Sequence, residues 1–360
     1  MNNIRLLDCT LRDGGYCNDC HFGFENEKEV VSSLVDANVD IIECGFLMNT
    51  VKYDRDRTRF TSLDQVAKII PEDRNGKLFV MLTDYGKYNL DDLPEYDGTS
   101  VDGLRVAFHK KDRYAGLEEC RQIKAKGYKV FIQAMVSVSY TDEEFVDLLQ
   151  RVNEIEPYAF YIVDSFGMMS HRDIIRLFSL VEHNLKDTIY IGFHAHNNMQ
   201  MAFANAQFLA ETQTNRDLII DSSLYGMGRG AGNLTTELFM QYLNRARGSS
   251  YDIHPVLHAI DDVIAPFFEE EHWGYSLPNY LSASHSAHPN YAGYLQTQED
   301  LTVQDMNNIF DMMDSKKKFN YDKNYIAALC DEYRDLCGKK SEADGVVEFP
   351  VCERRAASGQ

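Results

Sequence analysis

Two histidines separated by a single residue, His194 and His196, are the strongest chemical signal in the sequence. They end an apolar run typical of a buried strand, in which side chains at i and i+2 point to the same side. Two such imidazoles can bind Mn²⁺, Fe²⁺, Co²⁺ or Zn²⁺, or can simply be satisfied by hydrogen bonds. Asp13 follows another apolar run and would add a carboxylate. We therefore predict a metal site formed by these three residues.

A buried ion pair is expected beside this site. Glu43 lies inside the apolar segment IIECGF, and a buried carboxylate needs a partner. Arg12, which directly precedes Asp13, is the obvious candidate. The pair could do no more than brace the fold. A guanidinium held beside a metal ion is also suited to stabilising an enolate oxygen.

A glycine-rich segment, GMGRGAGN at residues 226–233, follows the last apolar run. It lacks the GK[ST] of a nucleotide-binding P-loop. Its backbone N–H groups could bind an anionic group, and a simple tight turn is an equal alternative.

Eight short apolar runs alternate with helical patterns, which is typical of parallel strands covered on both sides. A doubly wound sheet would want GxGxxG after the first strand, where LRDGGY stands instead. We therefore predict an α/β fold, a (β/α)₈ TIM barrel with a C-terminal helical extension. The predicted strands are Arg5–Cys9, Asp40–Phe46, Lys77–Thr83, Gly103–Phe108, Lys129–Val136, Ala159–Val163, Ile189–His194 and Leu218–Ser222.

The eight units fill residues 1–247, close to the ~250 residues that such a barrel usually takes. Residues 248–352 have no strand of comparable strength and form the predicted extension, with helices over Val256–Phe268, Leu301–Met313 and Tyr325–Leu336. Residues 353–360 are predicted to be a disordered tail.

Composition excludes several functions. The formal charge of −20 disfavours contact with nucleic acid. No apolar run is long enough for a membrane span and no signal sequence is visible, so we expect a cytoplasmic protein with cysteine thiols. Cys17 to His21 matches the haem-attachment pattern CxxCH, but covalent haem attachment normally follows export. A CxxC redox pair is the other alternative for this segment.

Together, DCTLRDG at residues 8–14, Glu43, HAHNN at residues 194–198 and GMGRGAGN resemble the HMG-CoA lyase-like (DRE-TIM) family of barrel metallolyases. The resemblance spans residues 4–244 and implies a bound divalent metal ion, with Mn²⁺ favoured and Mg²⁺, Co²⁺ or Zn²⁺ as alternatives. It implies that Arg12 stabilises an enolate and that Glu43 orients Arg12. The implied metal ligands, or residues next to the metal, are Asp13, His194, His196 and Asn233.

GMGRGAGN most resembles the 4-hydroxy-2-oxovalerate aldolase branch, and no cysteine stands in this loop as it does in HMG-CoA lyase. The sequence departs from that branch at Tyr16, where the aldolases carry a histidine that acts as base. A tyrosine is a poorer base near neutral pH. The aldolases also place a catalytic tyrosine in their C-terminal region, for which Tyr291 or Tyr294 is the candidate. A packed structural tyrosine is the alternative.

We therefore expect a metal-dependent aldolase that cleaves or forms a 4-hydroxy-2-oxo acid from pyruvate and an aldehyde. The main alternative is an acyl-CoA/2-oxo acid condensing enzyme of the isopropylmalate or homocitrate synthase type. A Schiff-base aldolase would need an inner lysine, and only Lys110 and Lys111 stand near the barrel mouth. A non-catalytic subunit is the last alternative. The expected partners are small molecules, a second copy in a homodimer and an aldehyde dehydrogenase.

Overall fold

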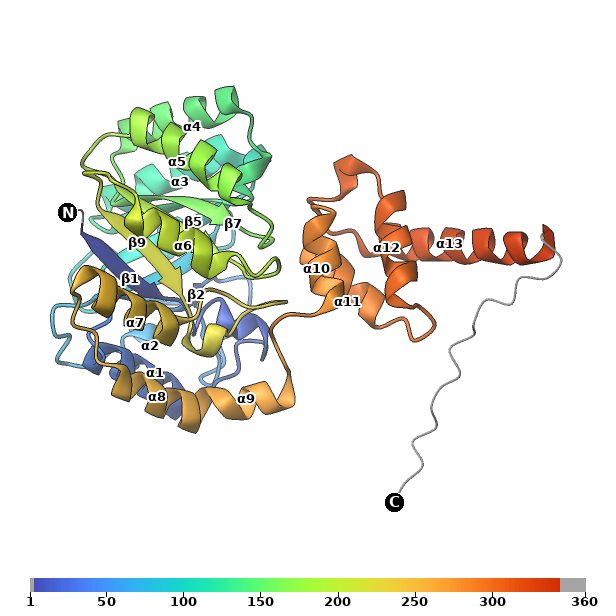
Figure 1. Cartoon of the computed structure of the whole chain (residues 1–360). Coiled ribbons are helices and arrows are strands. Elements are labelled where there is room, and N and C mark those ends of the chain that lie inside the picture. The colour runs from blue at the N-terminus through green and yellow to red at the C-terminus, as the bar shows by residue number, and fades with distance from the viewer. Residues whose placement is uncertain (1–2, 344–360) are drawn as a thin grey trace, which may run out of the picture.

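The computed structural model describes residues 3–343, and the side chains up to residue 337. Eight parallel strands form a closed barrel, because β1 pairs with both β9 and β2 (Figure 1). A short ninth strand of two residues, β3 (Arg59–Phe60), pairs with the end of β2. All eight predicted strands are confirmed, with ends shifted by one or two residues. They are β1 Ile4–Asp8, β2 Ile41–Leu47, β4 Leu78–Asp84, β5 Gly103–Phe108, β6 Lys129–Ala134, β7 Ala159–Asp164, β8 Tyr190–Ala195 and β9 Leu218–Ser222.

Helices cover the outside of the barrel. The N-termini of α4 and α5 are capped, because Thr141 and Ser170 each accept a hydrogen bond from the backbone N–H three residues on. Strands buried on both faces explain why their sequences are continuously apolar and do not alternate. The covering helices are α1 Phe24–Asp36, α2 Leu63–Val66, α3 Arg113–Ala125, α4 Asp142–Ile155, α5 His171–Asn184, α6 Ala202–Glu211 and α7 Thr236–Arg247.

The predicted boundary between barrel and extension does not match the packing. The helix predicted over Val256–Phe268 is observed as α8 (Ile253–Ala259), a π-helical turn and α9 (Ala265–Glu270). It packs against α1 and α7, and its buried side chains belong to the barrel core. That core extends to Trp273, so the two cores separate after this residue and not at Arg247.

A second, smaller core holds the extension together. Its members run from Leu281 to Cys330. The predicted helices over Leu301–Met313 and Tyr325–Leu336 are observed, whereas the first two helices were missed because each has only eight residues and a proline at its first or second position. The predicted tail at 353–360 lies outside the described residues. The helices are α10 Leu277–Ser284, α11 Pro289–Gln296, α12 Val303–Met312 and α13 Lys323–Ala343.

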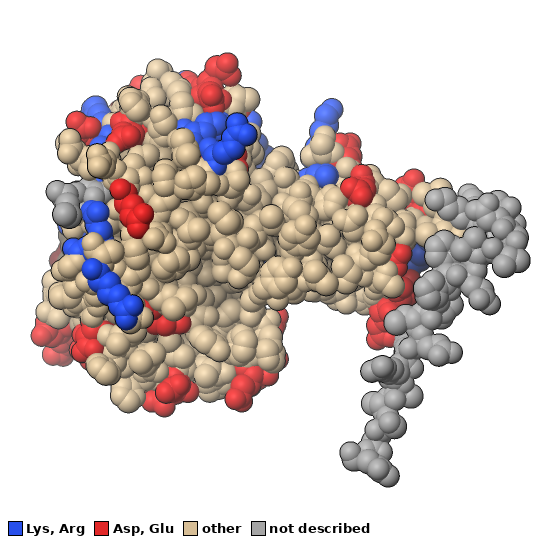
Figure 2. Space-filling view, viewed as in Figure 1, with Lys and Arg blue, Asp and Glu red and all other residues tan. Residues whose placement is uncertain are grey.

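The extension lies at the end of the barrel where the strands finish (Figure 1). Phe166, in the loop after β7, contacts two aromatic rings of the extension: His288 at 5.2 Å and Phe319 at 6.1 Å between centroids. On the face in Figure 2, charged side chains lie mostly toward the edges, and much of the surface where barrel and extension meet is uncharged. Within residues 3–343, no helix is both long and apolar enough to cross a membrane.

Candidate metal centre

Asp13, His194 and His196 meet at the mouth of the barrel, as the sequence predicts. Each offers one ligand atom, and the three atoms lie within 4.8 Å of one another. His196 Nε2 is 3.7 Å from Asp13 Oδ2, and all three side chains are buried. Two nitrogens and one oxygen converging at this spacing form a donor set suited to a divalent transition metal.

Two strand ends position these ligands. After β1, the chain turns so that Cys9 O accepts the backbone N–H of both Arg12 and Asp13, at 3.1 and 2.8 Å. β8 carries His194, and His196 follows it with its N–H donated to the backbone oxygen of Asp164 at 3.2 Å. The strand alternation thus directs both imidazoles inward.

The protonation states of two of these residues suit metal binding. Burial by itself would raise the pKa of Asp13, but the Arg12 guanidinium, the two histidines and the hydrogen bond from Asn233 together outweigh it and hold that pKa well below its usual range. Burial lowers the pKa of His196 to about 3, so its imidazole is neutral at pH 7. A carboxylate and a neutral imidazole are the forms that bind metal ions.

A buried chain of charges supports the site from below. Arg12 Nε donates to Glu43 Oε2 at 2.8 Å, which confirms the predicted pairing, and Arg105 Nη1 reaches the same oxygen at 2.8 Å. Arg105 also pairs with Asp221. Asp221 Oδ2 lies 3.0 Å from His194 Nδ1, so this carboxylate accepts the Nδ1 proton and leaves Nε2 as the ligand atom.

Arg105 and Asp221 were not singled out in the sequence. Both interrupt otherwise apolar strands, in GLRVAF of β5 and LIIDS of β9. A charged residue in the middle of a buried strand needs a buried partner, which was the signal that could have found them. Their partners lie on strands that meet only when the barrel closes.

Asn233 lies beside the three ligands. Its Nδ2 donates to Asp13 Oδ2 at 2.7 Å and to Met227 O at 3.1 Å, while its Oδ1 is buried with no hydrogen-bond partner. Gly232 allows this approach: its φ is +76°, and a Cβ there would lie 2.1 Å from Gly226 O. The glycine-rich segment therefore acts as a tight turn that brings Asn233 to the site.

A small cavity of about 70 Å³ opens directly above these residues. Arg12 and the three candidate ligands line it, together with Tyr16, Asp84 and Arg229 among others. Asp84, the last residue of β4, was also missed, although it stands at a strand end like the residues that were predicted.

Tyr16 lines this cavity with 43% of its surface exposed, between Phe46 and the Arg229 guanidinium. Burial of the phenol within the barrel mouth, and then the nearby Asp84 carboxylate, raise the pKa of Tyr16 to about 12. Its phenol therefore stays protonated at neutral pH, which makes it a hydrogen-bond donor and a poor base.

Tyr291 is not brought to this site. It is fully buried in the core of the extension, where its hydroxyl lies 2.9 Å from Lys317 O and 2.8 Å from Asn320 O and accepts the backbone N–H of Asp322. It does not line the metal cavity. The structural alternative considered for this tyrosine fits its contacts, and the catalytic role does not.

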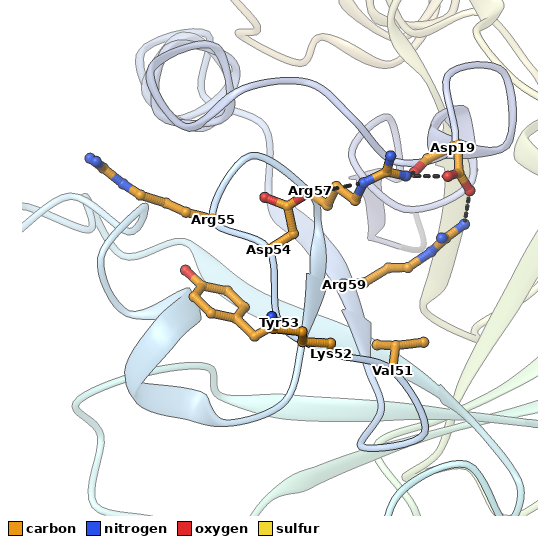
Figure 3. A pocket seen from close by; sticks show the side chains of 8 residues that line it. All are labelled: Asp19, Val51, Lys52, Tyr53, Asp54, Arg55, Arg57 and Arg59. Atoms are coloured by element: carbon orange, nitrogen blue, oxygen red, sulfur yellow. Dashed lines mark hydrogen bonds and ion pairs between the residues drawn. The ribbon is translucent and has the colours of Figure 1, made fainter.

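A larger cavity of about 740 Å³ lies in the loop after β2 (Figure 3). Arginines dominate its wall, but Arg57 and Arg59 both pair with Asp19, and Arg57 also pairs with Asp54. In Figure 3 the Arg55 side chain points away from this cluster. Its two carboxylates offset only part of the charge of its one lysine and three arginines, and the cavity shares no lining residue with the metal cavity.

The cysteines of the CxxCH segment pack against the protein. Cys20 is buried, and the Cys17 thiol contacts Gly228 O at 3.2 Å. The seven cysteines in the described part of the chain are all free thiols.

Comparison with known proteins agrees with this geometry. Residues 111–263 match the HMGL-like family model. A 4-hydroxy-2-oxovalerate aldolase of Rhodococcus jostii is 26% identical over 271 residues, 74% of this chain and 75% of that protein. The 4-hydroxy-2-oxovalerate aldolase of Geobacillus stearothermophilus is 25% identical over 270 residues, 73% of this chain and 76% of its own.

Solved structures share the fold. An N-terminal domain from Bacteroides vulgatus superposes with a TM-score of 0.71 at 24% identity, covering 82% of this chain and 97% of that one. The HMG-CoA lyase of Brucella melitensis gives a TM-score of 0.56 at 14% identity, covering 75% and 99%.

The closed barrel, the polar site at its mouth and these similarities define a (β/α)₈-barrel enzyme of the aldolase type. More particularly, residues 111–263 match the HMGL-like family model, and the chain is similar over about three quarters of its length to 4-hydroxy-2-oxovalerate aldolases.

Proposed function

We propose that this enzyme is a divalent-metal-dependent aldolase that cleaves or forms a 4-hydroxy-2-oxo acid, with pyruvate and an aldehyde as the other reactants. One observation carries the proposal: three buried ligand atoms within 4.8 Å of one another, with the Arg12 guanidinium paired to one of the ligands. The names of the relatives in Rhodococcus and Geobacillus support the same reaction.

The residues present fit a metal ion. Asp13, His194 and His196 would hold it, and the unpartnered Oδ1 of Asn233 is available beside them. Mn²⁺ is the ion we favour, as the resemblance to the DRE-TIM metallolyases implies. When bound, such an ion would act as a Lewis acid on the carbonyl of the 2-oxo acid.

Arg12 is held by Glu43 on one side and Asp13 on the other. A guanidinium fixed in this way needs no rearrangement to stabilise the negative charge that develops on the enolate oxygen. Glu43 is a positioning residue, because it acts through Arg12.

A proton must leave the C4 hydroxyl for the C3–C4 bond to break. Asp84 lines the cavity, and its carboxylate makes no hydrogen bond or ion pair with any described residue. Burial raises the pKa of Asp84, although Arg12 opposes this shift. We assign the role of base to Asp84, and Tyr16 donates a hydrogen bond to the substrate.

Replacing Asp84 with asparagine is therefore expected to lower kcat by about 10²–10⁴-fold, the usual contribution of a general base. Tyr16→Phe is expected to have a smaller effect, since it removes one hydrogen bond. Steady-state rates of the two variants check the assignment. A larger loss in Tyr16→Phe than in Asp84→Asn would move the role of base back to the tyrosine.

The proposed reaction is tested by stripping the purified enzyme of metal, reloading it with Mn²⁺ and adding 4-hydroxy-2-oxopentanoate. Pyruvate release is followed with lactate dehydrogenase. We expect pyruvate from the loaded enzyme and none from a sample kept in EDTA. A parallel reaction contains acetyl-CoA and a 2-oxo acid, and free thiol is measured.

Tightly bound Mn²⁺ without pyruvate release would contradict the aldolase proposal, and thiol release would then identify the acyl-CoA condensing alternative. A chain that binds no divalent metal would contradict both. The cytoplasmic location, the homodimer and the aldehyde dehydrogenase partner stay predictions.

A further inference from the structure

A second cavity, of about 400 Å³, lies beside the metal cavity at the ends of β5 and β6. Met135 lines both cavities. The end of β5 leads from the metal cavity to the 400 Å³ cavity. Ala107 lines the metal cavity, and His109, two residues on, lines the 400 Å³ cavity. Phe319 of the extension also lines the larger cavity. A molecule reacting in the small cavity therefore has room to extend into the large one.

This neighbouring cavity contains two cations that form no hydrogen bond or ion pair with a carboxylate of the described residues. The third cation, Lys110, already has partners, because it pairs with Glu144 and donates a hydrogen bond to Ser139 O. Lys111 is exposed, and within the described part of the chain it makes no hydrogen bond or ion pair. Arg113 donates hydrogen bonds only to neutral oxygens, Lys110 O at 3.0 Å and the Tyr114 hydroxyl at 2.9 Å, and its Nε is buried without a partner. The Glu144 and Asp147 carboxylates are near enough for its charge to lower their pKa, but neither pairs with it.

Unpaired cations in this position call for an explanation in a chain whose formal charge is −20. In the cavity of Figure 3, by contrast, Arg57 and Arg59 are paired with carboxylates. Arg113 is also the first residue of α3, whose thirteen residues place the positive end of a helix dipole at the same wall. The positive charge at this wall of the cavity can therefore bind an anionic ligand.

The wall is also held in a strained conformation. Val136 has φ +52°, a left-handed backbone that β-branched residues rarely adopt. Its N–H donates to Ser165 Oγ at 2.9 Å, and Ser165 lines the metal cavity. Strain of this kind is concentrated at ligand sites, and here it links the two cavities.

We propose that the 400 Å³ cavity binds the phosphate group of a phosphorylated aldehyde, while the carbonyl carbon of that aldehyde lies in the metal cavity. The inference rests on the proposed aldolase function. Two unpaired cations match the charge of a phosphate monoester, about −1.5 to −2 at pH 7. Lysine supplies a point charge, and arginine can bind phosphate through two parallel hydrogen bonds.

In the reaction, a bond forms between the methyl carbon of pyruvate and the aldehyde carbon. The methyl group loses one proton and the aldehyde oxygen gains one, so no oxidant or further reactant is needed. The phosphate group stays attached throughout.

The test compares three aldehydes in aldol addition to pyruvate by the Mn²⁺-loaded, full-length enzyme: acetaldehyde, succinic semialdehyde and glycolaldehyde phosphate. We expect kcat/KM at least tenfold higher for glycolaldehyde phosphate than for acetaldehyde. Lys111→Gln should reduce this advantage by about tenfold, the value of a charged hydrogen bond, and leave acetaldehyde unchanged. The matched control, Lys52→Gln, alters a lysine of the cavity in Figure 3 and should change neither rate.

Binding of glycolaldehyde phosphate, measured by calorimetry without pyruvate, separates this inference from the proposed function. Binding that Lys111→Gln weakens supports the phosphate site even if no aldehyde is condensed, which would contradict only the aldolase proposal. If acetaldehyde is condensed and glycolaldehyde phosphate has no higher kcat/KM, the phosphate site is overturned. The aldolase proposal then stays in place. A preference for succinic semialdehyde over glycolaldehyde phosphate would also overturn it.

Discussion

Replacing Asp13 with asparagine is expected to abolish high-affinity metal binding and to lower kcat/KM by about a thousandfold or more. The change is isosteric, so the loss comes from the negative charge. Asp13 is the carboxylate of the candidate ligand set, and Arg12 pairs with it. A metal ion acting as a Lewis acid contributes several kcal/mol to a transition state, and each ~1.4 kcal/mol is worth a factor of ten in rate.

The measurement is the Mn²⁺ content after dialysis, together with the rate of pyruvate release. Asp19→Asn is the matched control, because Asp19 lies in the same loop but pairs with Arg57 and Arg59 at the surface. The control should keep both metal and activity. An Asp13→Asn enzyme that retains one equivalent of Mn²⁺ and normal activity would show that the metal lies elsewhere.

Replacing Arg105 with methionine is expected to lower the free energy of unfolding of the barrel by about 3–5 kcal/mol. Arg105 is fully buried, and its guanidinium lies between Glu43 and Asp221. Without it, Asp221 keeps only the hydrogen bond from His194, and no cation offsets the charge of this buried carboxylate. Removing one member of a buried ionic network costs far more than removing an exposed pair.

Urea unfolding followed by the fluorescence of Trp273 measures this effect, because Trp273 is the single tryptophan of the chain and belongs to the barrel core. The control is Arg121→Met, which removes a surface arginine that pairs with Glu118 and Glu154. The control should leave the unfolding midpoint unchanged. Equal midpoints for the two variants would contradict a structural role for the buried network.

Much of this enzyme could be predicted from its sequence. The eight strands are continuous apolar runs, and this local pattern persists in the folded protein because both faces of each strand are covered. Asp13 and His196 follow strand ends and His194 lies near the end of its strand, so a barrel by itself brings them to one rim. The pairing of Arg12 with Glu43 followed from the cost of burying a lone carboxylate.

Tyr291 shows where sequence reasoning stopped. Its surroundings are set by the packing of the extension, whose core closes over it and gives its hydroxyl two backbone carbonyls. The boundary after Trp273 has the same origin, because α8 and α9 cover the barrel although they follow its last strand. Helix periodicity predicts that a segment is buried, but not which core buries it.

The sequence by itself determined the order of the strands, the fold class and the residue types at the rim of the barrel. Only the tertiary structure decided that Arg105 and Asp221 complete the support of the site, that Asp84 faces the metal cavity, and that Lys111 lies in a cavity beside it. The physical reason is that local propensity acts over neighbouring residues. Charge pairing and cavity shape, by contrast, arise between residues such as Arg105 and Asp221, which are 116 positions apart and meet only when the barrel closes.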